Sequence, residues 1–97
     1  MNDLERLAQF RSLGADISPE KEALILSKPG AFEGMVRQKV EDYGFDEAEA
    51  VKESASDVEM CDYGMRNGVL WCYGTVGVSF WWRESTNEWV CDEDELP

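Results

Sequence analysis

The sequence contains no histidine, and its 97 residues include only three cysteines and three prolines. Without histidine, the commonest general base and the usual nitrogen ligand of zinc are missing, so Ser-His or Cys-His catalysis and a mixed Cys/His metal site are excluded. The longest uncharged run, 67–82, has 16 residues, fewer than the roughly 20 that a membrane-spanning helix needs. The first residues carry acids where a secretory signal carries bases, so we expect a cytoplasmic protein with no membrane contact.

Basic residues are also scarce, with nine Lys and Arg against 21 Asp and Glu, which leaves a net charge of −12. Such a surface repels phosphate, so direct binding to nucleic acid or to an anionic membrane is not expected. The composition is nevertheless 43% apolar and 11% aromatic, enough for a packed core. We predict one folded acidic domain spanning residues 1–97.

The three cysteines, Cys61, Cys72 and Cys91, are odd in number and share no CxxC spacing. Each lies in a strand-like run, where a free cysteine behaves as a small buried hydrophobe. We predict free thiols, with no metal and no cofactor. One disulfide, or a metal site that uses all three thiols, is the alternative.

The first part of the chain, about 3–55, predicts three to four helices. Apolar residues over 4–13 predict a first helix that is capped by Asn2 or Asp3 and ends at Gly14. Ser18 followed by proline predicts the start of a second helix, which ends before Pro29-Gly30.

Two further helices are predicted by spacing. One apolar stripe precedes Gly44, and we interpret it as the core face of a third helix: Phe32, Met35, Val36, Val40 and Tyr43. Asp46 with Glu49 is typical of a capping box, and it predicts a short fourth helix.

The second part, about 57–92, has the period of two that is typical of strands, which we predict over 58–63, 69–73, 76–83 and 88–92. Asn67-Gly68 predicts a type I′ hairpin, because both residues tolerate positive φ. Gly74-Thr75 indicates a type II′ turn, or Gly74 and Gly77 mark bulges. The predicted fold is α+β, with three to four helices packed on one face of an antiparallel meander of three to four strands, followed by an acidic tail, 92–97.

The excess negative charge lies in two segments. Residues 1–40 are neutral and 63–83 carry +2, whereas 41–62 carry −8 and 84–97 carry −6. A protein that uses charge only for solubility intersperses its signs. The tail is interpreted as a frayed, solubilising end, with weak binding of a hard cation as the alternative.

Four tryptophans lie within 71–89, and Trp81 and Trp82 are adjacent in a predicted strand. Successive side chains of a strand point to opposite faces, so helices on one face bury only one of the pair. We predict that the other is exposed, where it is a candidate anchor for a partner. Cover by a second layer, a loop or a second copy of the chain, giving a homodimer through the sheet face, is the alternative.

The acids of the middle segment are spaced regularly. Residues four apart on a helix, such as Asp42 and Asp46 or Glu49 and Glu53, lie about 5–6 Å apart. In a strand, Asp57 and Glu59 share a face at about 6.6 Å. These separations are similar to the spacing of phosphates along a nucleic-acid strand. We hypothesise a phosphate-like row, the alternative being an ordinary solvated face: Asp42, Asp46, Glu47, Glu49, Glu53, Asp57 and Glu59.

In these properties the chain resembles the small acidic inhibitors that phages and mobile elements encode, chiefly anti-CRISPR and anti-restriction proteins. The resemblance covers size, an initiator Met1 and charge concentrated at Glu41–Asp62 and Glu84–Glu95. It involves no defining motif, so no functional residue is carried over from the family. It implies a target, namely a Cas effector or other nuclease whose basic channel is read through backbone charge.

The leading hypothesis is therefore a non-enzymatic inhibitor that occupies the nucleic-acid groove of such a target, with the acidic row as its contact and Trp81 or Trp82 at the edge. We expect no enzymatic activity, since 97 residues with one small core leave little depth for a substrate cleft. The alternative is an interaction module, such as an acidic subunit, an adaptor or a toxin-neutralising partner, that binds through the aromatic sheet face.

Overall fold

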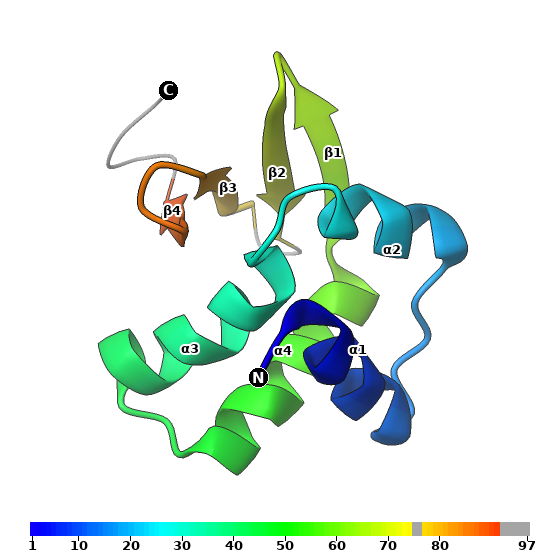
Figure 1. Cartoon of the computed structure of the whole chain (residues 1–97), viewed down its shortest axis with the longest axis vertical. Helices are drawn as coiled ribbons and strands as arrows, with labels where there is room; N and C mark the ends of the chain where they lie inside the picture. The colour runs from blue at the N-terminus through cyan, green and yellow to red at the C-terminus, as the bar shows by residue number, and fades with distance from the viewer. Residues whose placement is uncertain (75–76, 92–97) are drawn as a thin grey trace.

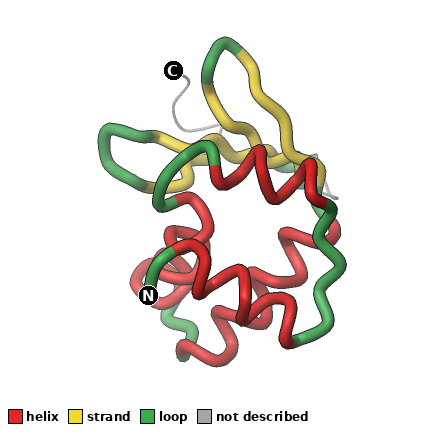
Figure 2. Tube along the Cα trace, turned by 45° about the vertical axis from the view of Figure 1, so that its right-hand side comes forward, coloured by secondary structure: helices red, strands yellow, loops and turns green. Residues whose placement is uncertain are grey.

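Four helices precede four strands in the computed structural model (Figure 1), which describes residues 1–74 and 77–91. The helices are α1 (Asp3–Ser12), α2 (Pro19–Leu26), α3 (Ala31–Tyr43) and α4 (Glu47–Met60), and the strands are β1 (Asp62–Arg66), β2 (Val69–Tyr73), β3 (Ser79–Arg83) and β4 (Glu88–Cys91). The strands pair antiparallel in the order β1-β2-β3-β4. The predicted α+β fold with a C-terminal meander is confirmed. Figure 2 shows the helices gathered on one side of the strands.

The predicted helix starts are confirmed. Asn2 caps α1 in a reciprocal capping box with Glu5, and Ser18 caps α2 with proline at the first helical position. Gly30, which precedes α3, has no side chain to cap that helix. A carboxylate from α1 takes this role, since Asp3 accepts the Gly30 and Glu33 backbone N–H groups at 2.7 and 2.9 Å.

The fourth helix is longer than predicted, and the strand predicted over 58–63 is displaced, because 58–60 belong to α4 and β1 begins at Asp62. α4 continues to Met60, so the helical part ends there and not near residue 55. Its buried residues follow the helical spacing through Val58: Ala50, Val51, Ser54, Ala55 and Val58. Lys21 of α2 holds the far end, where its ammonium donates to the carbonyl oxygens of Val58, Glu59 and Cys61 at 2.7, 3.2 and 2.8 Å.

The sheet follows its predicted turns where the structure describes them. Asn67 and Gly68 join β1 to β2 with φ of 51° and 78°, as a type I′ turn requires. The third strand begins at Ser79, later than predicted, and the Gly74 N–H donates to Val78 at 2.8 Å. Residues 75–76, which belong to the predicted turn and strand start, lie outside the described residues, as does the acidic tail, 92–97.

The core lies between the helices and the inner face of the sheet. The Trp82 indole lies where α3 comes close to the sheet. Trp82 packs against Gly34 in the middle of α3, and a Cβ at that glycine would lie 2.6 Å from the Trp82 ring. Glycine therefore permits the helix to contact the sheet at this point. Other buried members of the core include Leu7, Phe10, Ile25, Phe32, Val36, Val58 and Leu70.

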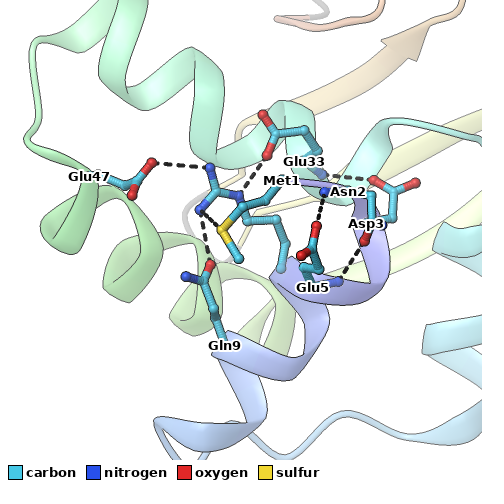
Figure 3. Close-up of polar contacts among 8 residues, drawn as sticks. Met1, Asn2, Asp3, Glu5, Gln9, Glu33 and Glu47 are labelled. Atoms are coloured by element: carbon cyan, nitrogen blue, oxygen red, sulfur yellow. Dashed lines mark hydrogen bonds and ion pairs between the residues drawn. The ribbon is translucent and has the colours of Figure 1, made fainter.

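A buried guanidinium joins three helices (Figure 3). Arg6 of α1 is 4% exposed. Its nitrogens donate to Glu33 of α3 at 2.6 Å, to Glu47 of α4 at 3.4 Å and to Gln9 at 3.0 Å. A charge removed from water in this way is tolerated only when it is paired and hydrogen-bonded.

We expect the Arg6→Ala variant to lose about 3 kcal/mol in free energy of unfolding, because Glu33 is left beside a buried cavity without its partner. Urea unfolding followed by circular dichroism measures this loss. Arg11→Ala is the matched control, since the Arg11–Glu22 ion pair is far more exposed and its loss costs about 1 kcal/mol or less. Equal losses in the two variants would contradict the role given to Arg6.

Candidate functional site

Trp81 and Trp82 lie on opposite faces of β3, but the prediction that one of them is exposed is wrong. Trp82, on the inner face, is 2% exposed, and Trp81, on the outer face, is 5% exposed. On the outer face Trp81 is paired across the strands with Trp71, and the guanidinium groups of Arg83 and Arg66 lie over the Trp81 and Trp71 rings at 5.8 and 5.3 Å. Cation–π packing therefore contributes to covering the face opposite to helices α1–α4.

The exposed aromatic side chains lie at the connection between α3 and α4. Residues 41–49, called here the acidic corner, are all exposed and contain five acids and no base. Tyr43, 65% exposed, and Phe45 have ring centroids 6.5 Å apart. Tyr43 and Val40 were predicted to lie on the core face of α3, and this is wrong because the last turn of the helix extends past the core. Gly44 then reverses the chain with φ of 73°.

The seven acids of the predicted row differ in what they contact. Four of them contact other residues of the chain, Asp46 and Glu47 at the start of α4 and Asp57 and Glu59 near its end. Asp46 accepts the Glu49 backbone N–H at 2.8 Å, Glu47 pairs with Arg6, and Asp57 pairs with Lys39 at 3.0 Å. Within residues 1–74 and 77–91, the side-chain carboxylates of Asp42, Glu49 and Glu53 form no ion pair and no hydrogen bond. These three carboxylates are available to a partner.

The strand spacing predicted for Asp57 and Glu59 is wrong, because both residues belong to α4. Two residues apart on a helix, their side chains point away from each other. Glu59 instead accepts the Asp16 backbone N–H at 2.7 Å. The carboxylates that do share a stripe of α4 are Glu49, Glu53 and Asp57, at successive intervals of four residues.

A pocket opens beside this stripe, between α3, α4 and the inner face of the sheet. Its volume is about 160 Å³, and its walls are mainly apolar. Met35, Tyr43, Phe80 and Trp89 supply the apolar part of the lining. We call this space the inner pocket. The sequence predicted no cleft, because the walls of this pocket come from two helices and all four strands, which are spread along the chain.

Polar side chains contribute the rest of the inner pocket. They are Gln38 and Lys39 from α3, Asp57 from α4, Tyr63 from β1 and Cys72 from β2. The Lys39–Asp57 ion pair therefore lies at its wall, next to Tyr43.

Tyr63 and Cys72 face each other across the β1–β2 pair. Burial is the main cause that raises the pKa of the Cys72 thiol from 9.0 to about 12. Burial, together with the neighbouring Cys72, also raises the pKa of Tyr63 well above its usual range. Both groups are therefore neutral at physiological pH, so Cys72 is not poised to act as a nucleophile.

All three cysteines are free, but they are half-buried and not the fully buried core thiols that were expected, and Cys61 caps the end of α4 outside the strands. The described residues contain no group of three or more Cys, Asp or Glu side chains placed to hold a metal ion. Neither the disulfide nor the three-thiol site is formed.

Comparison of the chain with protein-family models, with curated proteins and with solved structures finds no match. In the part of the chain that the structure describes, none of the helices is long and apolar enough to cross a membrane.

The raised pKa values make stability depend on pH at the alkaline end. The unfolded chain releases the Cys72 proton near pH 9.0, whereas the native state holds it to about 12. The free energy of unfolding therefore falls as the pH rises through this window, and is unaffected by Cys72 below it. Urea unfolding measured from about pH 8 to about pH 11 should show this decrease in the free energy of unfolding. The free energy of unfolding should fall less steeply with pH in Cys72→Ala than in the control Cys91→Ala. Identical slopes in the two variants would contradict the raised pKa of Cys72.

Proposed function

We propose that this chain is a stoichiometric protein inhibitor that binds the basic nucleic-acid groove of a nuclease or a CRISPR surveillance complex and keeps DNA or RNA out of it. It acts by occupying the groove, without turnover. A target of this kind places the chain in the cytoplasm, that of the host cell if a phage encodes it. The observation that carries the proposal is the acidic corner, nine successive exposed residues with five acids and no base.

The charge of this region supports a basic partner. Asp42 at the corner, and Glu49 and Glu53 on the α4 stripe, form no ion pair with a cation of the described residues. Carboxylates four residues apart repel each other by a few tenths of a kcal/mol. A groove lined by Lys and Arg relieves this repulsion, and it binds successive phosphates through contacts of the same kind.

The exposed aromatic side chains support the same region. Tyr43 and Phe45 lie within the acidic corner, and aromatic side chains dominate the energetics of protein interfaces. They replace Trp81 and Trp82 as candidates for the edge of the contact. An interaction module centred on the sheet face has less support, because both of those tryptophans are buried.

We expect reversal of the three available acids to abolish inhibition by removing the charges that compete with phosphate. The target is found by titrating the protein against a panel of purified nucleases and guide-loaded Cas effectors, with DNA cleavage and gel-shift binding as readouts. Inhibition should saturate at one equivalent and weaken with added salt, since charges are screened beyond about 10 Å at 0.1 M. The triple variant combines Asp42→Lys, Glu49→Lys and Glu53→Lys.

A second triple variant serves as the matched control. It changes the net charge by the same amount but reverses exposed acids outside the corner and the α4 stripe: Asp16→Lys, Glu20→Lys and Asp62→Lys. This control should inhibit like the parent. If both triple variants lose inhibition equally, net charge and not the acidic corner is responsible. Full inhibition by the first variant would refute the proposal.

A further inference from the structure

We propose that the inner pocket receives one apolar side chain of the partner, an aromatic ring or a large aliphatic group flanked by Lys or Arg. This inference rests on the proposed function, because it assumes that the partner is basic. It adds a hydrophobic anchor to a contact that the acidic corner makes through charge.

The size of the inner pocket favours a single side chain. Sites for cofactors and drug-sized ligands have volumes of roughly 300–1,000 Å³, and this pocket has about 160 Å³. A cavity of about 150 Å³ holds one benzene ring. One side chain seated in a pocket of this kind, with charged contacts around it, is the usual form of a binding hot spot.

The main wall of the pocket is already in place. The Gln38 side chain donates to the Trp89 carbonyl oxygen at 3.0 Å and accepts the Trp89 backbone N–H. The Trp89 indole N–H donates to Ala31 at 3.0 Å, and its ring packs 5.4 Å from Trp82 and 6.2 Å from Tyr63. A ring that enters the pocket therefore meets an aromatic surface that needs no rearrangement, and preorganisation of this kind favours affinity.

The charges at the pocket specify what flanks the incoming side chain. Lys39 is the basic residue in the lining, and Asp57 neutralises it at 3.0 Å. Glu53 lies one turn before Asp57 on the same stripe of α4, and its carboxylate forms no ion pair within residues 1–74 and 77–91. Tyr43 joins the pocket to the acidic corner. A partner that reaches the pocket thus crosses a surface with excess negative charge, which attracts Lys and Arg.

Methionine methyl groups provide a direct readout in the full chain. The protein has four methionines, of which Met35 lines the pocket while Met60 and Met65 are exposed elsewhere. The probes are two peptides, acetyl-Lys-Arg-Phe-Arg-Lys-amide and the same peptide with alanine in place of phenylalanine. With ¹³C-methyl methionine, the phenylalanine peptide should shift the Met35 signal through its ring current and leave those of Met60 and Met65 in place.

We expect the phenylalanine peptide to bind at least about tenfold more tightly than the alanine peptide, from the apolar surface that one ring buries. Cys72→Leu fills the pocket and should remove this difference. Tyr43→Ala removes part of the wall at an exposed position and should reduce it, whereas Leu13→Ala, a similarly exposed control, should not. Unchanged Met60 and Met65 signals show that each variant is folded.

The outcomes separate the inner pocket from the acidic corner. Equal affinity for both peptides, with binding that weakens in salt, would overturn the pocket and leave the proposed function standing. A Met35 shift that persists in Cys72→Leu would also overturn it, as would no Met35 shift with either peptide at millimolar concentration. Two results together would support the pocket. Cys72→Leu should abolish the tenfold preference for the phenylalanine peptide. Glu53→Gln should weaken the binding of both peptides equally and leave that preference in place.

Discussion

The buried guanidinium of Arg6 is the interaction on which the arrangement of the helices depends. It cannot be left unpaired away from water, so Glu33 and Glu47 must lie within reach of it at the same time. That requirement brings the start of α3 and the start of α4 against α1. Asp3 adds to the same junction by capping α3. With both helices fixed there, the segment between them, the acidic corner, is held away from the core.

This constraint also divides the acids into two groups. Glu33, Glu47, Asp46 and Asp57 hold the fold together through ion pairs and a helix cap. Their charge is partly neutralised or directed inward, which makes them poor contacts for a partner. The acids left without an ion pair are fewer than the net charge of −12 suggests, and Asp42, Glu49 and Glu53 lie in the acidic corner and on the first half of α4. A compact surface of this kind specifies an orientation for a partner, which a uniform charge does not.

The fold was predictable where local signals agree with one another. The Asn2 and Ser18 caps and the Asn67-Gly68 turn are determined by the residues themselves and do not depend on distant contacts. The length of α4 was missed because Val58 suits either a helix or a strand. Its helical state depends on burial in the core and on Lys21, from a different helix, capping the end.

The candidate site was predictable only in part. The concentration of acids is visible in the sequence, but their availability depends on cations that come from α1 and α3. The exposure of Tyr43 was hidden by a periodic pattern that continues past the end of the core. The inner pocket gives no local signal at all, because α3, α4 and all four strands each supply part of its wall. The strand pattern likewise gave no sign that the Arg83 guanidinium packs over the Trp81 ring on the outer face.

The contact between Gln38 and Trp89 has a consequence for solubility. β4 lies at one edge of the sheet, and at Trp89 both its N–H and its carbonyl oxygen are bonded to the Gln38 amide. An open edge offers such groups to any extended segment, which is how sheets join and fibres begin to grow. The glutamine side chain occupies the position that an additional strand would take, so a helix protects this edge from assembly with other chains.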